Sequence, residues 1–480
     1  MAYQRNQNGL LQRDYGCKWQ APRFHFTLAL RYMIEKGKTM GAMKSNMSLR
    51  RAGLVPCLLL LLTAFCAPAA QAQTRLIVRD SLGLPGINLT CLLMGCRVVT
   101  GLGDPSGQLF LVTLPAFLNP ITALLQLNLQ LGILSVEIDQ TVNTTPAYAN
   151  GYPSYLTDET PTSYYGATVW HGYVAQPANQ LVRTDATHSA FNVTGSGTTV
   201  AVIDTGVDPT SPVLKNVLVN GYDFTRNTYG GSETNDVQAS PNTSQAQTAI
   251  VNQRTVAVLD QRTVAVLDGG PYQAFGHGTM TAGIVHLVAP QAKIMPLKAF
   301  SANGTGYDSD ILRAIYYAVN HGAKVMNMSF DFSSYSPELA RAIQYSNSKG
   351  VISVASAGND GQYKTVYPGG LPGVIDVAST SNYDVQSSFT NYGAPPVWMA
   401  APGEGVVTTY PWGTYAAGWG TSFSTPFVAG TAALMLGANG NCSSSHVSIG
   451  LANADFIGNL NLGAGRLDTY QAVQACGLLH

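Results

Sequence analysis

From residue 195 onward, short apolar runs alternate with longer segments of helical spacing. The runs predict strands at 198–203, 293–299, 324–328, 351–355 and 374–378, and the spacing predicts a helix at 309–320 that stops before Gly322. Strands that are apolar on both faces and separated by helices are typical of a parallel sheet covered on both sides. The pattern therefore predicts an α/β domain with a mostly parallel central sheet and helices on both faces.

A second, smaller pattern occupies residues 74–142. It predicts strands at 75–80, 108–114 and 133–138, and a helical stretch near 120–131. Residues 143 to about 175 are rich in Thr, Tyr, Pro, Ala and Gly without a clear period, and this composition indicates a linker. A small α+β unit, a linker and a large domain suggest a precursor that is cut, although a permanent accessory domain fits the same order.

An apolar run at 54–65 precedes both of these units. Arg50 and Arg51 lie ahead of it, and the triplet Ala70-Gln71-Ala72 follows it. A basic stretch, about a dozen apolar residues and a small-x-small triplet are typical of a secretory signal peptide, so we expect cleavage after Ala72. A permanent membrane anchor is disfavoured because the run is shorter than the roughly 20 residues that span a bilayer.

The overall composition excludes several classes of protein. The chain has 26 Lys plus Arg, 26 Asp plus Glu and 46% apolar residues. A nucleic-acid binder would be expected to show a basic excess, and a disordered chain would have a low apolar content. Residues 1–51 hold ten basic and two acidic side chains, which leaves 16 basic and 24 acidic ones for the rest. The basic residues in excess are therefore confined to the leader.

The seven cysteines are too few for a disulfide scaffold in 480 residues. Removal of residues 1–72 leaves four of them, Cys91 close to Cys96 and Cys442 with Cys476 near the carboxyl end. An even number in an exported chain suits two local disulfides with these pairings, and free buried thiols are the alternative.

Three polar residues lie where parallel α/β sheets gather catalytic groups, at strand ends and helix starts. Asp204 follows a buried strand in TVAVIDTGVD, and His277 leads into a helix in FGHGTMTAGIV. Ser422 begins a long apolar helix in GWGTSFSTPFVAGTAALM, where Gly420 allows close backbone approach. Each residue alone also fits an ordinary role as a helix cap or a turn residue.

Together these three residues supply the parts of a nucleophilic site. A hydroxyl is a weak nucleophile until a base takes its proton, and imidazole does so well when a carboxylate fixes its tautomer and stabilises its charged form. A serine at a helix amino terminus also has backbone N–H groups beside the oxyanion that develops.

The order of these residues and the motifs around them resemble the subtilisin-like serine proteases. IDTGVD, GHGTMTAG and GTSFSTPFVAG match three signatures of that family, and SAGND, VIDVAST, SSFTNYG and MAAPGEGV lie where the resemblance would put them, over roughly residues 180–475. The resemblance implies a three-layer subtilisin-like fold, with Asp204 as the orienting acid, His277 as general base and then acid, and Ser422 as nucleophile. Asn359, in SAGND, matches the side-chain donor to the oxyanion, although it also fits a turn residue.

The same resemblance implies contacts with substrate. The stretch NMSFDF matches the strand that lines the primary specificity pocket and pairs with the substrate backbone. The residues expected to bind substrate are Ser329, Phe330, Asp331, Ala357 and Gly358. The family usually has Gly where Asp331 stands, so a carboxylate there is expected to narrow the cleft or to favour basic substrate groups.

The small unit resembles the propeptides of these proteases, especially in ILSVEIDQTV near its end. In the family such a segment assists folding, because a parallel sheet depends on distant pairings that form slowly, and it occupies the site until it is cut away. The expected organisation is a non-native or misassigned extension at 1–42, a signal peptide at 43–72, a propeptide domain at 73–142, a linker with the processing site at 143–175 and a catalytic domain at 176–480. We expect the processing cut between Asn143 and Gln180.

The segment between Asp204 and His277 is longer than in compact members of the family. The excess lies at about 227–272 and includes the octapeptide QRTVAVLD twice, at 253–260 and at 261–268. Two identical adjacent copies indicate a local duplication, in which one copy forms a strand while the other is looped out. The flanking segment at 232–249 is polar, and its composition predicts a surface insertion.

No metal or nucleotide motif of the HExxH, CxxC or phosphate-loop type occurs in the sequence. Calcium is often bound in the family, with one ligand an Asp after the Pro that follows the catalytic Asp segment, but here Val213 follows Pro212. The acids Asp308, Asp310 and Asp384 are expected to be solvated. We therefore expect no required cofactor and no metal-binding residue at this position, and a structural calcium elsewhere stays open.

These observations predict a secreted serine endopeptidase, extracellular or periplasmic, which is made as a self-processing zymogen and acts through an acyl-enzyme intermediate. The expected partners are protein or peptide substrates and the chain's own propeptide as intramolecular inhibitor. We expect a monomer without nucleic acid and without a permanent membrane anchor. The alternatives are a catalytically weak homologue that acts as a binding protein, and an envelope-anchored structural protein that keeps its leader.

Overall fold

A computed structural model describes residues 73–116, 118–143, 153–236, 256–259, 274–393, 395–438 and 442–478. We call residues 73–143 the small unit and residues 153–478 the large domain. The extension and the signal peptide expected at 1–72 lie outside the described residues. None of the helices within the described ranges has the length and apolar content that a bilayer crossing requires.

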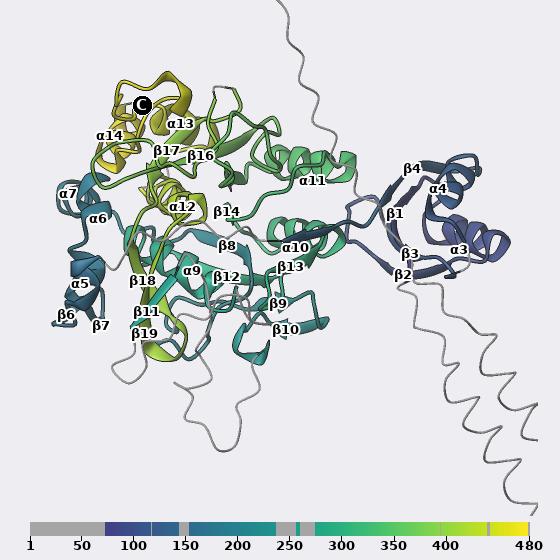
Figure 1. Cartoon of the computed structure of the whole chain (residues 1–480), viewed down its shortest axis with the longest axis horizontal. Coiled ribbons are helices and arrows are strands. Elements are labelled where there is room, and N and C mark those ends of the chain that lie inside the picture. The colour runs from purple at the N-terminus through teal and green to yellow at the C-terminus, as the bar shows by residue number, and fades with distance from the viewer. Residues whose placement is uncertain are drawn as a thin grey trace, which may run out of the picture. The chain divides into compact units, whose positions relative to one another are not determined.

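A central sheet of eight strands organises the large domain, in the order β10-β9-β12-β8-β14-β15-β16-β17 (Figure 1). Its strands are β8 (Thr199–Asp204), β9 (Gly221–Asp223), β10 (Thr228–Gly230), β12 (Lys293–Lys298), β14 (Val325–Met328), β15 (Ile352–Ser356), β16 (Val374–Thr380) and β17 (Met399–Pro402). All neighbours from β9 to β17 pair in parallel, whereas β10 pairs with β9 antiparallel. The predicted, mostly parallel sheet is confirmed.

Helices cover both faces of this sheet. Four of them form the outer layers: α9 (His277–Val288), α10 (Asp308–Asn320), α11 (Pro337–Ser348) and α12 (Thr421–Gly437). Val200 and Val202 of β8 lie in the same core as the apolar side chains of α9 and α12. Ala201 and Ile203, which point to the opposite face, lie in the core with α10 and α11. The alternation along one buried strand thus produces the three layers that were expected.

The other described elements of the large domain surround this sandwich. They are η2 (Ser154–Thr157), β6 (Pro161–Tyr164), β7 (Ala167–Trp170), α5 (His171–Val174), α6 (Pro177–Leu181), α7 (Thr184–Phe191), η3 (Thr234–Asp236), β11 (Val256–Leu259), β13 (Thr305–Tyr307), β18 (Val406–Tyr410), η4 (Pro411–Gly413), β19 (Thr414–Gly418), α13 (Ser444–Leu451), η5 (Leu460–Leu462) and α14 (Thr469–Leu478). A second sheet, in the order β11-β19-β18, packs beside α9, where the Thr408 hydroxyl donates to the Met280 carbonyl at 2.8 Å.

The small unit is an antiparallel sheet, in the order β2-β3-β1-β4, with two helices on one face. Its elements are β1 (Arg75–Asp80), α3 (Gly83–Met94), β2 (Arg97–Gly101), β3 (Leu109–Thr113), α4 (Pro120–Asn128), β4 (Ile133–Ile138) and β5 (Thr141–Asn143). The predicted strands and the predicted helix are confirmed, but α3 and β2 were missed. The reason for α3 is that both of its faces are apolar: Ile87 and Cys91 are buried, whereas Leu89, Leu92 and Leu93 form an exposed face.

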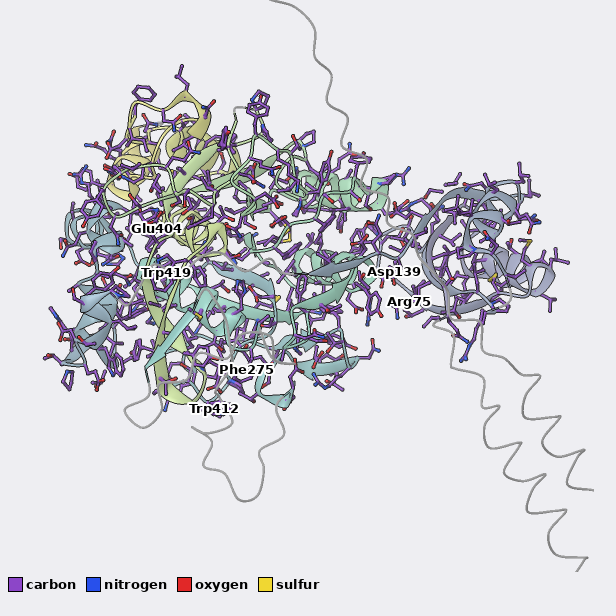
Figure 2. All side chains as sticks on the ribbon, viewed as in Figure 1. Arg75, Asp139, Phe275, Glu404, Trp412 and Trp419 are labelled. Carbon is purple, nitrogen blue, oxygen red and sulfur yellow. A yellow bond between two sulfur atoms is a disulfide. The ribbon has the colours of Figure 1, made fainter. Side chains whose placement is uncertain are left out.

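Two carboxylates of the small unit lie at the starts of two helices of the large domain. Asp139 accepts hydrogen bonds from the backbone N–H and the hydroxyl of Ser309 in α10, each at 2.9 Å, and it pairs with Arg75 at 2.7 Å (Figure 2). Glu137 accepts from the hydroxyl of Ser336, the residue that precedes α11, at 2.9 Å. Negative charge is favourable at a helix amino terminus, so these contacts stabilise the association of the two parts.

A buried ion pair and a short strand pairing complete the contact between these parts. Arg79 pairs with Glu338 of α11 at 2.7 Å and with Asp104 at 3.1 Å. The strand β5 pairs antiparallel with β13. Ile77 and Leu111 of the small unit belong to the same apolar core as α10 and α11.

Residues 153–175, which the composition assigned to a linker, are part of the large domain. Tyr164 and Tyr173 belong to its main core, and their hydroxyls donate to the backbone carbonyls of Leu287 and Gly283 in α9, at 2.5 and 2.7 Å. A tyrosine buries its ring while its hydroxyl finds a backbone acceptor, so a Tyr-rich segment can pack against a helix without a regular apolar period.

The segment between Asp204 and His277 also differs in part from the expected surface insertion. Glu233 is fully buried and the side chain of Asp236 is 6% exposed, whereas Asn235 is exposed, so two carboxylates of residues 232–236 point into the domain. Within the first octapeptide copy, β11 pairs antiparallel with β19, as expected for one copy. Residues 237–255 and the second copy lie outside the described residues.

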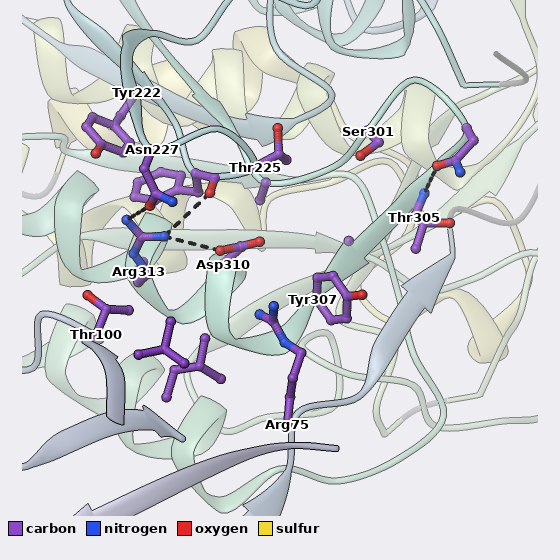
Figure 3. A pocket seen from close by; sticks show the side chains of 16 residues that line it. Arg75, Thr100, Tyr222, Thr225, Asn227, Ser301, Thr305, Tyr307, Asp310 and Arg313 are labelled. Carbon is purple, nitrogen blue, oxygen red and sulfur yellow. Dashed lines mark hydrogen bonds and ion pairs between the residues drawn. The ribbon is translucent and has the colours of Figure 1, made fainter. Parts of the chain in front are cut away.

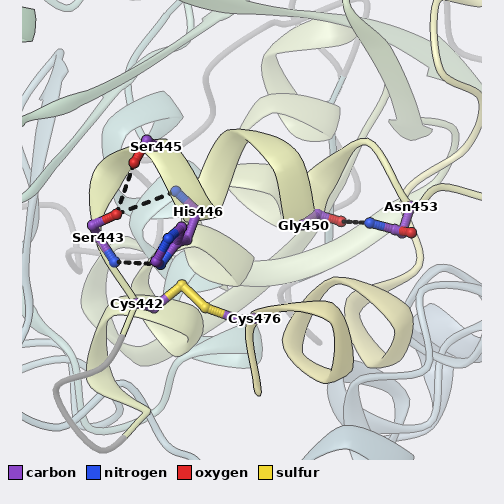
Figure 4. The surroundings of a disulfide bond; sticks show 7 residues. All are labelled: Cys442, Ser443, Ser445, His446, Gly450, Asn453 and Cys476. Atoms are coloured by element: carbon purple, nitrogen blue, oxygen red, sulfur yellow. Dashed lines mark hydrogen bonds between the residues drawn. A yellow bond between two sulfur atoms is a disulfide. The ribbon is translucent and has the colours of Figure 1, made fainter. Parts of the chain in front are cut away.

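Both predicted disulfides are present. Cys91 and Cys96 join the end of α3 to the start of β2, with Cα atoms 4.4 Å apart. Cys442 and Cys476 join the segment before α13 to α14, with Cα atoms 5.9 Å apart (Figure 4). The second bridge closes a sequence separation of 34 residues, against 5 for the first.

Loss of the longer bridge is expected to destabilise the protein. A disulfide that closes a loop of this length restricts the unfolded chain and contributes about 2–4 kcal/mol to the free energy of unfolding. The double variant Cys442→Ala/Cys476→Ala, made in the uncut chain that carries Ser422→Ala, should therefore unfold at a lower temperature in a thermal unfolding series. The control Cys91→Ala/Cys96→Ala, which opens a much shorter loop, should have a smaller effect, and equal effects of the two variants would contradict this account.

Candidate active site

The predicted triad residues lie at one edge of the central sheet. Asp204 is the last residue of β8, His277 is the first residue of α9, and Ser422 lies in the first turn of α12. The carboxyl ends of parallel strands meet at a single edge, and these side chains meet there because β8 leads into it and both helices begin at it.

Asp204 and His277 form a buried hydrogen bond. Nδ1 of His277 lies 2.7 Å from Oδ1 of Asp204, and the two residues are 7% and 2% exposed. The carboxylate also accepts from the Thr205 backbone N–H at 2.7 Å and from the Thr281 hydroxyl at 3.2 Å. These donors fix the carboxylate, and the carboxylate in turn fixes the imidazole ring with Nε2 as its remaining nitrogen.

A glycine allows the start of α9 to approach the Asp204 turn. A Cβ atom on Gly278 would lie 1.9 Å from the carbonyl oxygen of Gly206, a distance that no side chain could adopt. The Gly278 backbone N–H instead donates to the hydroxyl of Thr205 at 2.9 Å. The glycine after His277 is therefore required by this close approach of two backbones.

The negative charges around His277 favour the protonated form of its imidazole ring. Burial disfavours the imidazolium, but the charge of Asp204, its hydrogen bond and the charge of Glu233 together outweigh that cost. The pKa of His277 is therefore raised above its usual value. The site can hold a proton on this ring in a region from which water is largely excluded.

The hydroxyl of Ser422 points to a neighbouring backbone segment in this structure. It donates to the carbonyl of Ser329 at 3.2 Å, while the hydroxyl of Ser329 donates to the carbonyl of Ser422 at 2.9 Å. The adjacent Phe423 ring lies 5.7 Å from the imidazole of His277, centroid to centroid, so the first turns of α9 and α12 face each other. A rotation about the Cα–Cβ bond of Ser422 is the movement that would direct its hydroxyl to the imidazole.

Asn359 lies beside the start of α12 and is 9% exposed. Its amide oxygen accepts from the backbone N–H of Thr421 at 2.9 Å and from the Thr421 hydroxyl at 3.1 Å. These contacts fix the amide through its oxygen, so the NH₂ group is the end that donates. The structure thus brings the side chain of Asn359 next to the helix turn that carries Ser422.

The residues expected to bind substrate lie after two neighbouring strands. Ser329, Phe330 and Asp331 follow β14, and Ala357 and Gly358 follow β15, which pairs with β14 in parallel. A Cβ on Gly358 would lie 3.4 Å from the carboxylate of Asp331, so this carboxylate packs against the glycine backbone. Burial and the charge of Asp360 raise the pKa of Asp331 to about 6, with Lys364 opposing the shift.

The structure adds Asp376, an acid that sequence reasoning passed over. It lies in β16, opposite Ala355 of β15, and is 1% exposed. Within the described residues its Oδ1 atom has no hydrogen-bond partner, and burial and the charge of Asp331 raise its pKa to about 8. The sequence did hold a signal for this residue, since an acidic side chain is unusual within a buried strand such as VIDVAST.

Glu233 is the second functional candidate that the sequence did not indicate. It is fully buried beside Asp204 and His277, the candidate catalytic pair, and its pKa is raised by burial to about 7. Its position in a polar segment concealed it, because composition alone cannot separate an inward carboxylate from a solvated one.

Two of the three acids that were expected to be solvated are buried, and the third, Asp384, has a side chain that is 31% exposed. Asp308 and Asp310 are 5% and 8% exposed, at the start of α10 where the small unit packs, so that expectation was wrong. Asp384 pairs with Arg466 at 2.8 Å. No group of three or more His, Cys, Asp or Glu side chains suited to a metal ion occurs within the described part of the chain.

Comparisons with known proteins agree on one protein family. The profile of the Subtilase family, Peptidase S8, matches residues 195–455. This chain belongs to the subtilase family of serine proteases. Thermitase of Thermoactinomyces vulgaris is 33% identical over 293 residues, which cover 58% of this chain and 90% of thermitase. The Thermophilic serine proteinase of Bacillus sp. (strain AK1) is 33% identical over 310 residues. The aligned region covers 61% of this subtilase chain and 64% of that relative.

A solved structure supports the fold of this subtilase independently. Fervidolysin from Fervidobacterium pennivorans, described as a keratinolytic enzyme related to subtilisin, superposes with a TM-score of 0.64 at 23% sequence identity. The alignment covers 84% of this chain and 61% of the fervidolysin chain. The three-layer, subtilisin-like α/β fold is therefore confirmed.

Replacement of the buried acid Asp376 by Asn is expected to stabilise the protein selectively at alkaline pH. The folded-state pKa is about 8, above the unfolded value, so the carboxyl costs nothing below about pH 4, costs progressively more between about pH 4 and pH 8, and costs a constant amount above pH 8. Asp376→Asn should raise the midpoint of thermal unfolding by several degrees at pH 9 and change it little at about pH 4. An equal shift at both pH values would contradict the titration of this group.

Proposed function

We propose that this subtilase is a secreted serine endopeptidase, made as a self-processing zymogen, that hydrolyses peptide bonds through an acyl-enzyme on Ser422. The observation that carries the proposal is the 2.7 Å bond between Asp204 and His277 at the edge of the sheet where Ser422 and Asn359 also lie. The leader pattern at 43–72 supports export. The chemistry assigned to these side chains requires no metal or cofactor.

In the proposed reaction, His277 acts first as a base and then as an acid. The Ser422 hydroxyl turns from the Ser329 carbonyl toward Nε2 of His277, which takes its proton as Oγ attacks the scissile carbonyl carbon. The imidazolium then gives that proton to the leaving amine as the C–N bond breaks. A water molecule, in place of the Ser422 hydroxyl, then hydrolyses the acyl-enzyme through the same two proton transfers by His277. Asp204 stabilises the imidazolium in both stages.

The oxyanion of the tetrahedral intermediate would be held by two donors. One is the amide NH₂ of Asn359, which Thr421 orients through its bonds to the amide oxygen. The other is the backbone N–H of Ser422, at the amino terminus of α12, where the helix dipole is also favourable. Removal of one such donor in a serine protease typically costs about 100- to 1000-fold in kcat.

We propose that the small unit is the inhibitory propeptide of this enzyme. Its β5 strand pairs with β13 in the manner of an extended peptide that adds to a sheet edge. A cavity of about 670 Å³ lies at this contact and is lined from both sides, by Arg75 and Leu111 of the small unit and by Tyr307 and Arg313 of the large domain (Figure 3). While β5 occupies β13, a substrate cannot use the same edge.

The proposed processing cut lies between Asn143 and Pro153. The chain is held by strand pairing up to Asn143, whereas Leu156, Tyr164 and Tyr173 are packed in the main core. A protease needs an accessible segment of chain, and a segment anchored by buried side chains does not supply one. This narrows the interval that the sequence alone left open between Asn143 and Gln180.

Ser422→Ala is expected to abolish both processing and labelling. Without the Ser422 hydroxyl no acyl-enzyme forms, so the variant should accumulate as the uncut precursor, while the wild-type chain should begin between residues 144 and 153 by amino-terminal sequencing. Wild-type protein freed of the small unit should react with a fluorophosphonate probe at Ser422. Absence of labelling in folded wild-type protein would instead favour the alternative of a catalytically weak binding homologue.

We further propose that Asp331 favours basic side chains at the residue before the scissile bond. Its carboxylate lies against Gly358, its charge acts on that of Asp376, and one oxygen of Asp376 has no hydrogen-bond partner within the described residues. A guanidinium or ammonium group would add to the positive charge of Lys364 near these two acids. Residues 144–180 contain no Lys or Arg, so the maturation cut would rely on the high effective concentration of an intramolecular substrate.

Removal of the Asp331 carboxylate is expected to change the cleavage preference. On a peptide library at pH 8, where the carboxyl is ionised, Asp331→Gly should lower the preference for Arg or Lys over Leu by about 10-fold, which corresponds to about 1.4 kcal/mol. Asp331→Asn, which keeps the size and removes the charge, should do the same. An unchanged preference in both variants would refute the proposal, and a change in Asp331→Gly alone would indicate that the side chain only narrows the cleft.

A further inference from the structure

Glu233 is a fully buried carboxylate directly beneath the candidate catalytic pair. Its Oε2 atom accepts from the Gly276 backbone N–H at 2.7 Å and from the Thr205 hydroxyl at 3.1 Å. Its Oε1 atom accepts from the Thr279 backbone N–H at 3.1 Å and also from the Thr279 hydroxyl. Every one of these neighbours is a donor, so the hydrogen bonds favour the ionised carboxylate and oppose the burial that raises its pKa to about 7.

These donors belong to the two segments that carry Asp204 and His277. Thr205 follows Asp204 directly, and Gly276 and Thr279 lie on either side of His277 in the sequence. Gly276 caps α9 without a side-chain hydrogen bond of its own, so the first turn depends on acceptors from elsewhere. Glu233 supplies them, and it thereby ties the first turn of the histidine helix to the turn after β8.

The charge of Glu233 also acts on the imidazole. It is one of the negative charges that raise the pKa of His277, after that of Asp204. The other titratable groups that face Glu233 are Lys298, which is fully buried and donates to the Thr205 carbonyl at 2.8 Å, and Tyr410. Asp236 pairs with Lys298 at 2.7 Å on the far side, so Glu233 is the carboxylate of this group that contacts the helix turn.

We propose that Glu233 is a positioning residue for the proteolytic reaction, which holds the His277 turn against the Asp204 turn and stabilises the imidazolium that forms during catalysis. The inference rests on the proposed function of the site. It predicts two separable effects, one on the geometry of the pair and one on the protonation of the imidazole. A carboxylate with a structural role alone would affect neither the rate per folded site nor its dependence on pH.

The test is a kinetic comparison of Glu233→Gln with the wild type, both as full chains matured and counted by active-site titration with a fluorophosphonate. A glutamine at 233 would place its NH₂ group opposite groups that are themselves hydrogen-bond donors, so one side of the site loses its acceptor. We therefore expect kcat to fall about 10- to 100-fold with KM changed less than about 2-fold. Because a negative charge is lost, the acid limb of the kcat/KM profile should move to lower pH by roughly 0.5 to 1 unit. An unmoved acid limb and an unchanged kcat in Glu233→Gln would overturn the proposal.

Two further variants keep the test decisive if Glu233→Gln does not mature. Thr279→Val removes a donor and leaves the charge, so kcat should fall while the acid limb stays in place. Asp236→Asn is the matched control, since it removes a buried carboxylate of the same network that does not contact the helix turn, and it should lower thermal stability without moving the acid limb. A rate unchanged in Thr279→Val, or an acid limb moved in Asp236→Asn, would count against the proposal.

The outcome can be separated from the fate of the proposed function. If wild-type protein is not labelled at Ser422 and cleaves no peptide, the proposed function itself fails. If the wild type is active and the Glu233 and Thr279 variants match it per titrated site, the proteolytic function stands and the positioning role is wrong.

Discussion

The hydrogen bond between Asp204 and His277 is the interaction on which the rest of the site depends. It joins residues 73 positions apart in the chain, and both partners are buried. A lone buried charge would cost several kcal/mol, so each partner makes the burial of the other tolerable. The bond forms because a parallel sheet directs β8 to the edge where α9 begins, and because Gly278 lets the two backbones approach.

Buried carboxylates with aligned donors recur through the molecule. Asp139 at the start of α10, Glu338 with Arg79, and Glu233 beneath the histidine turn each follow this rule. Asp376 differs, since one of its oxygens has no partner within the described residues. Most of these buried carboxylates thus hold helix starts, whereas burial keeps Asp376 largely protonated near neutral pH.

The parts that could be predicted from sequence are those with a local signature. The buried strands have continuous apolar runs, the disulfides have isolated cysteine pairs, and Asp204, His277 and Ser422 stand in motifs with a specific order. The parts that failed lack such signatures. Residues 153–175 pack through tyrosines whose hydroxyls bond to α9. The helix α3 has leucines on an exposed face as well as apolar residues on its buried face. Glu233 lies in a polar segment, and only its partners from distant parts of the chain show that its side chain points inward.

The sequence by itself determined the class of fold, the order of its elements and the three residue types at the strand ends and helix starts. Only the tertiary structure decided which carboxylates are buried, which donors surround them and toward which neighbour the Ser422 hydroxyl points. The physical reason is that periodicity depends on residues a few positions apart, whereas burial and hydrogen bonding at this site depend on segments such as Thr205 and Glu233 that meet across 28 residues of chain.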